Sequence, residues 1–367
     1  MSLMNERTGK NATSPSNEYD PFLRGRFPVG ARTIQALDQE RNRRFPCEIW
    51  YPAAAQFAGQ DIAPETQDAF TVALSNTSRQ QLAVRDADAE PGTYPLIIFS
   101  HSSGGDRRSA TFLCTHLSSH GYVVAALDHS ERVAPELTRQ ANETDEQKAT
   151  RGAAMIASRV PDIRFLLDHL LNDATWESTI NLDPARIGLV GHSFGGWTVL
   201  AAPDVEPRIR AIVALAPGGA SKRKPGILPA TLAFDWGCNI PTLYLVAEDD
   251  ISLPLAGVLE LYERTPATKQ MVILRRADHL HFMDNVEQLH ESVRAMTLPG
   301  ELAWIPQEMR PIAELCSGQQ AHLFTRGLAL CHFDAALKQK AAAQRFLLGD
   351  VEAELAARGV DAIAHRQ

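Results

Sequence analysis

The sequence predicts a doubly wound α/β protein, because strand-like apolar runs alternate with helical patterns along the chain. A second observation is that these runs are continuous, as in strands that are covered on both faces of a parallel sheet. A third is the segment Gly-His-Ser-Phe-Gly-Gly at 191–196, which directly follows one such run. The runs that predict the central strands are residues 94–100, 122–127, 187–190, 209–215, 242–246 and 271–274.

Other elements follow from the same patterns. Residues 32–37 and 47–51 flank a charged turn and predict an antiparallel hairpin. The clearest helical pattern covers residues 160–170, and another covers 333–348. Two connections, at about 131–158 and 218–239, are longer than packing requires. Long loops at the carboxyl ends of strands carry the substrate contacts of many α/β enzymes.

We expect one α/β domain over residues 21–350. It follows an N-terminal segment, 1–20, whose polar composition predicts disorder. The domain includes a helical extension at about 298–350, which either covers the active site, makes a dimer contact or completes the core. The segment at 351–367 is predicted to be a C-terminal tail, either helical or irregular.

Composition excludes several classes of protein. With 44% hydrophobic and 22% charged residues among 367, the chain is typical of a globular protein. A formal charge of −8 argues against nucleic acid as a partner. No window of about 18 apolar residues predicts a membrane span. The five widely spaced cysteines fit reduced thiols, and the polar N-terminus lacks a secretory signal, so we expect a cytoplasmic protein. The sequence makes no prediction of oligomeric state.

Ser193 is the candidate nucleophile. In a G-x-S-x-G turn from strand to helix, the serine adopts a strained backbone, and Gly191 and Gly195 supply the space around it. Its hydroxyl then stands at a helix N-terminus, where backbone amides favour a developing oxyanion. The alternative is a glycine-rich helix cap.

The loop after the run at 94–100 reads Ser-His-Ser-Ser-Gly-Gly. Its small residues let a backbone amide turn inward beside the amide that follows the nucleophile. We therefore predict an oxyanion hole formed by the amides of Ser103 and Phe194. His101 lies inside this loop, where a structural hydrogen bond is expected rather than a role as base. An ordinary turn at the end of a strand is the alternative reading of the loop.

A triad acid is expected after a later strand. The run at 242–246 leads into Glu248, Asp249 and Asp250, with Pro254 four residues beyond the last of them. That spacing selects Asp250, with Asp249 in reserve and a solvated acidic turn as the alternative. The acid would orient the histidine ring and stabilise the imidazolium.

The base should follow the last strand, where the chain offers His279 and His281. Either histidine gives the order serine, acid, histidine that is typical of this kind of triad. The histidine pair with Asp284 also suggests a metal site, but no further ligand group has suitable spacing. We expect neither a metal nor another cofactor.

With these residues, the chain resembles the α/β-hydrolase superfamily, and within it the platelet-activating factor acetylhydrolase and dienelactone hydrolase-like branch. The resemblance covers most of residues 27–290, including segments 27–30, 49–52, 99–101 and 119–126 and the serine motif. It implies ester hydrolysis without a metal and an oxyanion hole from the loop after the third strand.

The resemblance also bears on the base. Such enzymes carry a histidine followed by Phe three residues later and Asp five residues later, as His279, Phe282 and Asp284 do. Cutinases and polyester hydrolases, which the chain resembles around the serine, place Phe directly after the histidine, which fits His281. We prefer His279 and keep His281 in reserve.

One departure weakens the transfer of phospholipid specificity. Animal acetylhydrolases carry their acid after the strand that follows the nucleophile helix, where residues 214–218 of this chain hold no carboxylate. The resemblance and the triad together predict a serine hydrolase that cleaves carboxylic esters of small molecules, with a preference for short acyl groups. Alternatives are a serine peptidase or amidase, a polyester or lactone hydrolase, and a catalytically silent binding protein of the same fold.

The insertion at 218–239 carries two further candidates. Phe234 and Trp236, with Ile227, Leu228 and Leu232, are predicted to form an apolar wall for the acyl group, although core packing explains them equally well. The basic run at 222–224 either attracts an anionic substrate or is a solvated charge run.

Overall fold

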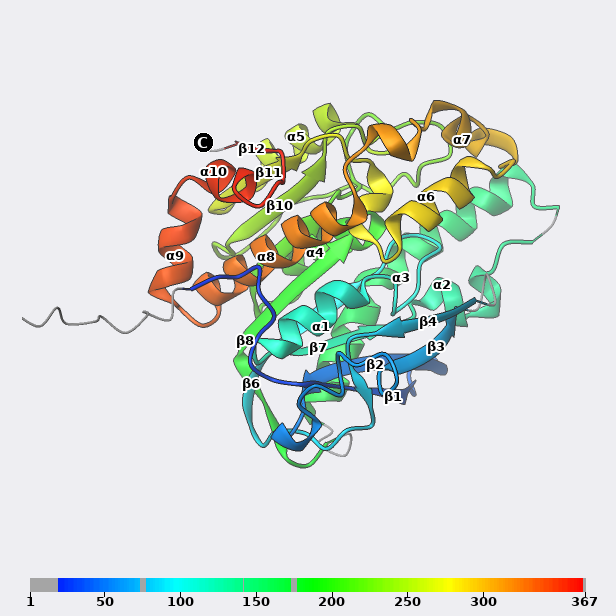
Figure 1. Ribbon diagram of the computed structural model, residues 1–367. Coiled ribbons are helices and arrows are strands. Elements are labelled where there is room, and N and C mark those ends of the chain that lie inside the picture. Colours follow the sequence, from blue (N-terminus) through cyan, green and yellow to red (C-terminus); the bar gives the residue numbers. More distant parts are fainter. Residues whose placement is uncertain (1–18, 73–76, 141, 173–176, 366–367) are drawn as a thin grey trace, which may run out of the picture.

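The computed structural model describes residues 19–72, 77–140, 142–172 and 177–365 (Figure 1). The strands are β1 (Val29–Asp38), β2 (Arg43–Pro52), β3 (Asp68–Val72), β4 (Thr77–Gln81), β5 (Val84–Arg85), β6 (Gly92–Ser100), β7 (Val123–Leu127), β8 (Ile180–His192), β9 (Ile209–Leu215), β10 (Thr242–Ala247), β11 (Lys269–Leu274) and β12 (Ala362–His365). The helices are α1 (Thr111–Ser119), α2 (Ser130–Val133), α3 (Asp145–Asn172), α4 (Phe194–Ala201), α5 (Leu255–Arg264), α6 (Val286–Arg294), α7 (Trp304–Glu308), α8 (Gly318–Ala336), α9 (Ala341–Leu348) and α10 (Val351–Ala356), with a 3₁₀ turn η5 at His279–Phe282.

The central sheet has the strand order β12-β11-β10-β9-β8-β6-β7-β2-β1-β5. The six apolar runs become β6 to β11, and every neighbouring pair among them is parallel. The predicted hairpin is present as β1 and β2, which pair antiparallel from Val29↔Pro52 to Asp38↔Arg43. The predicted α/β-hydrolase architecture, a mostly parallel sheet with helices on both faces, is confirmed.

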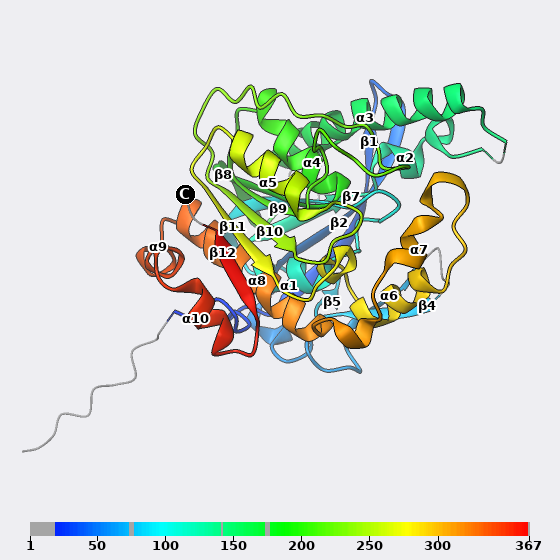
Figure 2. The ribbon, with the colours of Figure 1, turned by 90° about the horizontal axis from the view of Figure 1, so that it is seen from above.

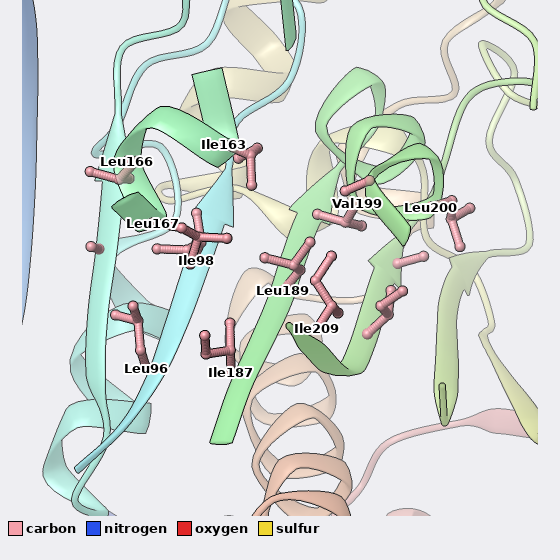
Figure 3. Close-up of a cluster of buried hydrophobic side chains, with 14 of the residues drawn as sticks. Leu96, Ile98, Ile163, Leu166, Leu167, Ile187, Leu189, Val199, Leu200 and Ile209 are labelled. Atoms are coloured by element: carbon pink, nitrogen blue, oxygen red, sulfur yellow. The ribbon is translucent and has the colours of Figure 1, made fainter. Parts of the chain in front are cut away.

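Helices cover the two faces of the sheet, with α3, α4 and α5 on one side and α1 and α8 on the other (Figure 2). Under α3 and α4, apolar side chains interdigitate with those of β6, β8 and β9 (Figure 3). Ile98 and Leu189 in this layer are completely buried. Each such side chain contributes about 1.5–3 kcal/mol relative to an exposed one. This core fixes the carboxyl ends of β6 and β8, from which the candidate site is built.

The connection at 131–158 is not the loop that was expected. It contains α2, a short 3₁₀ turn and the first half of α3, which begins at Asp145 rather than near Val160. Pro161 lies inside α3, whereas proline is more typical of the first turn of a helix. In the sequence, Pro161 therefore resembles a proline in the first turn of a helix.

The C-terminal region also differs in detail. The predicted helix at 333–348 is divided into α8 and α9, because Gln339 adopts a left-handed backbone (φ 52°) and the chain turns there. The tail begins as α10 but ends as β12, which pairs antiparallel with β11. No glycine or proline marks the turn at Gln339.

Residues 1–18 of the segment predicted to be disordered lie outside the described residues. Tyr19 and Asp20, at its end, are placed against the C-terminal helices: Tyr19 donates a hydrogen bond to Asp334 (3.1 Å), and Asp20 pairs with Arg358 (3.3 Å). For these two residues the prediction of disorder is wrong. A two-stranded sheet of β3 and β4 was not predicted at all.

All five cysteines are free thiols, and four of them are buried. None of the described helices is both long and apolar enough to cross a membrane. The cytoplasmic location stays a prediction.

Candidate active site

Ser193 occupies the turn between β8 and α4 with φ 59° and ψ −114°, a conformation that costs free energy for any residue with a Cβ. Two glycines allow the turn. A Cβ at Gly191 would stand 2.2 Å from the carbonyl oxygen of Gly195, and a Cβ at Gly195 would stand 1.9 Å from that of Ser100. The start of α4 therefore lies directly against the end of β6, as the G-x-S-x-G motif predicted.

His279 lies in η5, after β11, and faces Ser193. Its Nε2 is 2.8 Å from the Ser193 Oγ, and its Nδ1 is 2.7 Å from the Asp250 Oδ2. The other carboxylate oxygen of Asp250 accepts hydrogen bonds from the amides of Ser252 (2.9 Å) and Leu253 (2.8 Å). The structure thus brings the predicted nucleophile, base and acid into one chain of hydrogen bonds.

The electrostatic surroundings of His279 favour its charged form. Burial lowers the pKa of this imidazole, but the charge and hydrogen bond of Asp250 more than offset burial, so the pKa is raised above its usual value. Asp250 itself has a buried side chain, 2% exposed, whereas the His279 ring remains 17% exposed. The arrangement suits a base that takes a proton from the serine and then carries a positive charge.

The reserve candidates have other partners. His281 is fully buried and lies 2.8 Å from the carboxylate of Asp278 and 3.0 Å from the carbonyl oxygen of Cys316. Asp249 pairs with Arg310 (3.1 Å). Neither residue is brought to Ser193.

The histidine pair with Asp284 does not gather around one point. Asp284 accepts hydrogen bonds from the amides of Thr111 (2.9 Å) and Phe112 (3.1 Å) and so holds the start of α1. Within the described part of the chain, no group of three or more histidine, cysteine, aspartate or glutamate side chains is suited to hold a metal ion.

The predicted oxyanion residues lie on the two elements that meet at this point. Phe194 is the first residue of α4, and Ser103 is exposed in the turn closed by the Gly105 amide on the Ser102 carbonyl (3.1 Å). His101, expected to be structural, is fully buried and lies 2.7 Å from the Ser102 carbonyl oxygen. Burial holds the pKa of His101 well below its usual value, so its ring is neutral.

Arg159 holds this loop and was missed by the sequence analysis. Its completely buried guanidinium donates hydrogen bonds to the carbonyl oxygens of His101 (2.6 Å) and Ser102 (3.3 Å) and pairs with Glu131. The same guanidinium lies over the ring of Phe194, 4.2 Å from its centroid. One side chain therefore contacts both elements that carry the predicted oxyanion amides.

A second buried layer supports the first. The amide of His129 donates a hydrogen bond to the His101 ring (3.1 Å), and the His129 ring bridges Ser100 (2.9 Å) and Asp162 (3.1 Å). Asp162 also accepts hydrogen bonds from Ser130. A polar residue at a core position of a helix pattern, as Arg159 and Asp162 are in α3, is the only signal that the sequence offers for this network.

His192, the residue before the nucleophile, is another residue that sequence reasoning missed. Its Nε2 lies 2.9 Å from the carbonyl oxygen of His279, and its ring packs 5.8 Å from that of Phe282. Burial holds the pKa of His192 well below its usual value. A neutral ring that donates to this carbonyl fixes η5, and with it the base, against the nucleophile strand.

The predicted apolar wall is divided. Phe234 and Trp236 pack together, with ring centroids 5.7 Å apart, and Trp236 donates to the carbonyl oxygen of Leu200 (3.2 Å) at the end of α4 far from Ser193. Their contacts are those of the core. Ile227 and Leu228 line a cavity, and Leu228 also packs against the core.

Comparison with known proteins finds ester hydrolases among the similar proteins. Residues 32–159 match the family model of platelet-activating factor acetylhydrolase, isoform II. "Cutinase est1" of Thermobifida alba is 24% identical over 237 residues, which are 64% of this chain and 69% of the relative. The platelet-activating factor acetylhydrolase of Gallus gallus is 24% identical over 250 residues, 55% of this chain and 56% of the relative.

A solved structure of a ferulic acid esterase from Streptomyces cinnamoneus has the same fold. It superposes with a TM-score of 0.59 at 23% identity, over 86% of this chain and 92% of the esterase. The strand order, the nucleophile turn between β8 and α4 and these relatives lead to one conclusion. The chain belongs to the α/β-hydrolase superfamily.

Proposed function

We propose that this carboxylic ester hydrolase works through a Ser193–His279–Asp250 triad and prefers esters with short acyl groups. The observation that carries the triad is the unbroken chain of contacts from the Ser193 Oγ through the His279 ring to the Asp250 carboxylate, at 2.8 and 2.7 Å. The word acetylhydrolase in the name of the matching family, and of the Gallus gallus relative, supports a short acyl group.

In the first step, the His279 Nε2 takes the proton of the Ser193 hydroxyl, and the serine oxygen attacks the carbonyl carbon of the ester. Asp250 accepts the Nδ1–H of the imidazolium that results. The amides of Ser103 and Phe194 donate to the oxyanion. His279 then protonates the leaving alkoxide, and the alcohol departs, leaving an acyl group on the serine.

The second step repeats the first with water in place of the serine. His279 takes a proton from water, the hydroxide oxygen attacks the acyl carbonyl, and the carboxylic acid leaves as the Ser193 oxygen recovers its proton. Both steps use the same base and the same donors. No electron transfer is required, since every bond change is a displacement at one carbonyl carbon.

The test is a series of p-nitrophenyl esters from acetate to palmitate, measured with the wild type and with Ser193→Ala. We expect an optimum at hexanoate or shorter. In the variant, kcat should fall by about 10⁴ to 10⁶, as for other triad serines. A variant that keeps most of its turnover would contradict the triad, and an optimum at long chains would contradict the short acyl group.

Three further readouts test the alternatives. Hydrolysis of matched p-nitroanilides faster than of esters would indicate a peptidase or amidase. A fluorophosphonate that labels the wild type but not Ser193→Ala would exclude a catalytically silent protein, since such a reagent requires an activated serine. Hydrolysis of a polyester film tests for a polyester hydrolase, because several similar proteins are cutinases.

A further inference from the structure

A cavity of about 440 Å³ lies between residues 217–228 and 252–260. Both walls continue into the candidate site. The amide of Gly218 donates to the carbonyl oxygen of Ser193 (3.0 Å), and the amides of Ser252 and Leu253 donate to the carboxylate of Asp250. The cavity therefore adjoins the segments that hold the nucleophile and the acid.

The lining of this cavity combines apolar walls with positive charge. Ile227, Leu228 and Leu253 are half-buried, and Val258 is buried beneath them. Such a surface suits a hydrocarbon chain of the substrate, because burying apolar area is favourable wherever water is displaced. An apolar lining alone does not distinguish a neutral chain from a charged one.

Two positively charged residues of the lining favour a negatively charged chain over a neutral one. Lys222 and Arg223 are both among the residues that line the cavity, and within the described ranges neither has an ion-pair partner. The third basic residue of the run, Lys224, pairs with Glu308 (3.0 Å). The acidic residue of the lining, Glu260, is already bound to Ser221 and Arg264. An anion that entered the cavity would therefore meet two unpaired positive charges.

The overall charge makes this local arrangement more selective. At −8 the whole chain repels anions at long range, so an anionic ligand gains only where cations are close to it. A chain with a hydrocarbon middle and an anionic end matches the apolar walls and the two cations at the same time. A neutral ester of equal length would use only the walls.

We propose that this cavity binds the end of the substrate remote from the scissile ester, and that Lys222 and Arg223 bind an anionic group there. The inference rests on the function proposed above, which it narrows to esters that carry a carboxylate or a similar anion. The two residues are specificity residues, since they bind the substrate without touching the reacting atoms.

The experiment compares p-nitrophenyl hexanoate with mono-p-nitrophenyl adipate, which has the same six-carbon acyl group but ends in a carboxylate. For the wild type at low salt, kcat/KM should be about tenfold higher for the adipate, as expected of a pair of partly exposed charge interactions. The difference should lie in KM, because binding that is equal in ground and transition states leaves kcat unchanged. High salt should reduce the difference between the two esters, because salt screens charge interactions.

Lys222→Gln/Arg223→Gln should lose this preference. The ratio of adipate to hexanoate kcat/KM should fall by about tenfold. The matched control is Arg44→Gln/Arg345→Gln, which removes the same charge from two exposed arginines outside the cavity lining. The control should keep the wild-type ratio, which separates a local contact from the change in net charge.

The outcomes separate this inference from the proposed function. Ser193-dependent hydrolysis of hexanoate with a wild-type ratio near one would overturn the anionic subsite and leave the triad intact. Equal losses of the ratio in both double variants would also overturn it, since net charge would then be the cause. Failure of Ser193 to matter for either ester would overturn both proposals together.

Discussion

The two flanks of Ser193 are built in opposite ways. On one side, the loop that carries the predicted oxyanion amide of Ser103 is held by Arg159 and Glu131, whose side chains are 0% and 5% exposed. On the other, the loop at 217–228 is held to α7 by Lys224 and Glu308, whose side chains are 37% and 48% exposed. Removing one partner of a buried charge pair costs about 3–5 kcal/mol of stability, whereas an exposed pair contributes about 0–1 kcal/mol.

The difference matches the different demands on the two flanks. Donors to an oxyanion act by being fixed before the reaction, because any reorganisation would consume the energy they supply. A substrate cavity has to admit and release ligands, and loops with few buried contacts open at low cost. The structure therefore puts its buried charges behind the loop of the predicted oxyanion hole, the closed flank, and leaves the cavity walls at 217–228 and 252–260, the open flank, lightly held.

The largest expected effect is at Asp250, the acid of the proposed triad, whose carboxylate accepts hydrogen bonds from the open flank. Asp250→Asn should lower kcat by about 10⁴, as loss of a triad acid does elsewhere, because the amide cannot stabilise the imidazolium. The wild-type kcat/KM should rise with pH through a pKa above 6.5, since the pKa of His279 is raised by Asp250. In the variant this midpoint should move to lower pH.

Asp249→Asn is the matched control, because it changes the neighbouring carboxylate, which pairs with Arg310 at the surface. Its activity and pH profile should stay within about twofold of the wild type, as for other exposed pairs. Equal losses in the two variants would contradict the assignment of the acid.

Arg159→Met tests the closed flank. It leaves Glu131 buried without its partner and frees the carbonyls of the oxyanion loop, so kcat should fall by about 10²–10³, with little change in KM. Removing one partner of a buried pair also costs about 3–5 kcal/mol of stability. Steady-state kinetics below the unfolding transition, with circular dichroism, separate the two effects.

Arg164→Met is the control on the same helix. Arg164 is 51% exposed and lies 3.6 Å from Glu206, so both kcat and stability should change little. Arg159→Lys should restore part of the lost kcat, because the ammonium keeps the charge but not the planar set of donors. A fall of stability without any fall of kcat would show that Arg159 only packs.

The contrast between the flanks also explains what the sequence predicts. Ser193, Asp250 and His279 each follow a continuous apolar run, so strand periodicity and chain order were enough to select them as candidates. The G-x-S-x-G motif gave additional support for the serine, because the tight turn leaves no room for side chains at Gly191 and Gly195.

The supporting residues were not predictable in this way. Arg159 lies one residue before the predicted helix at 160–170 and Asp162 lies inside it, but the hydrogen-bond partners of both are more than twenty residues away. Choosing between His279 and His281 from the residues alone was equally out of reach, because both lie in one turn. Their contacts in the folded chain separate them, because His279 reaches Ser193 and Asp250 whereas His281 pairs with Asp278.

The smallest effect on catalysis, with a clear effect on stability, is expected at His281. Its pKa is about 10, because the hydrogen bond and charge of Asp278 more than offset the lowering by burial. The folded protein therefore keeps a proton that the unfolded chain releases above about 6.5. The stabilisation is fully present below pH 6.5 and is lost as the pH rises to 10, by at most about 1.4 kcal/mol per pH unit.

Urea unfolding of the wild type between pH 6 and 10 should show this decline, and His281→Gln should flatten it while a Ser193-dependent esterase activity persists. An unchanged slope in the variant would mean that His281 is neutral in the folded protein. The turn that carries the candidate base would then lack a buried charge pair like that of the closed flank.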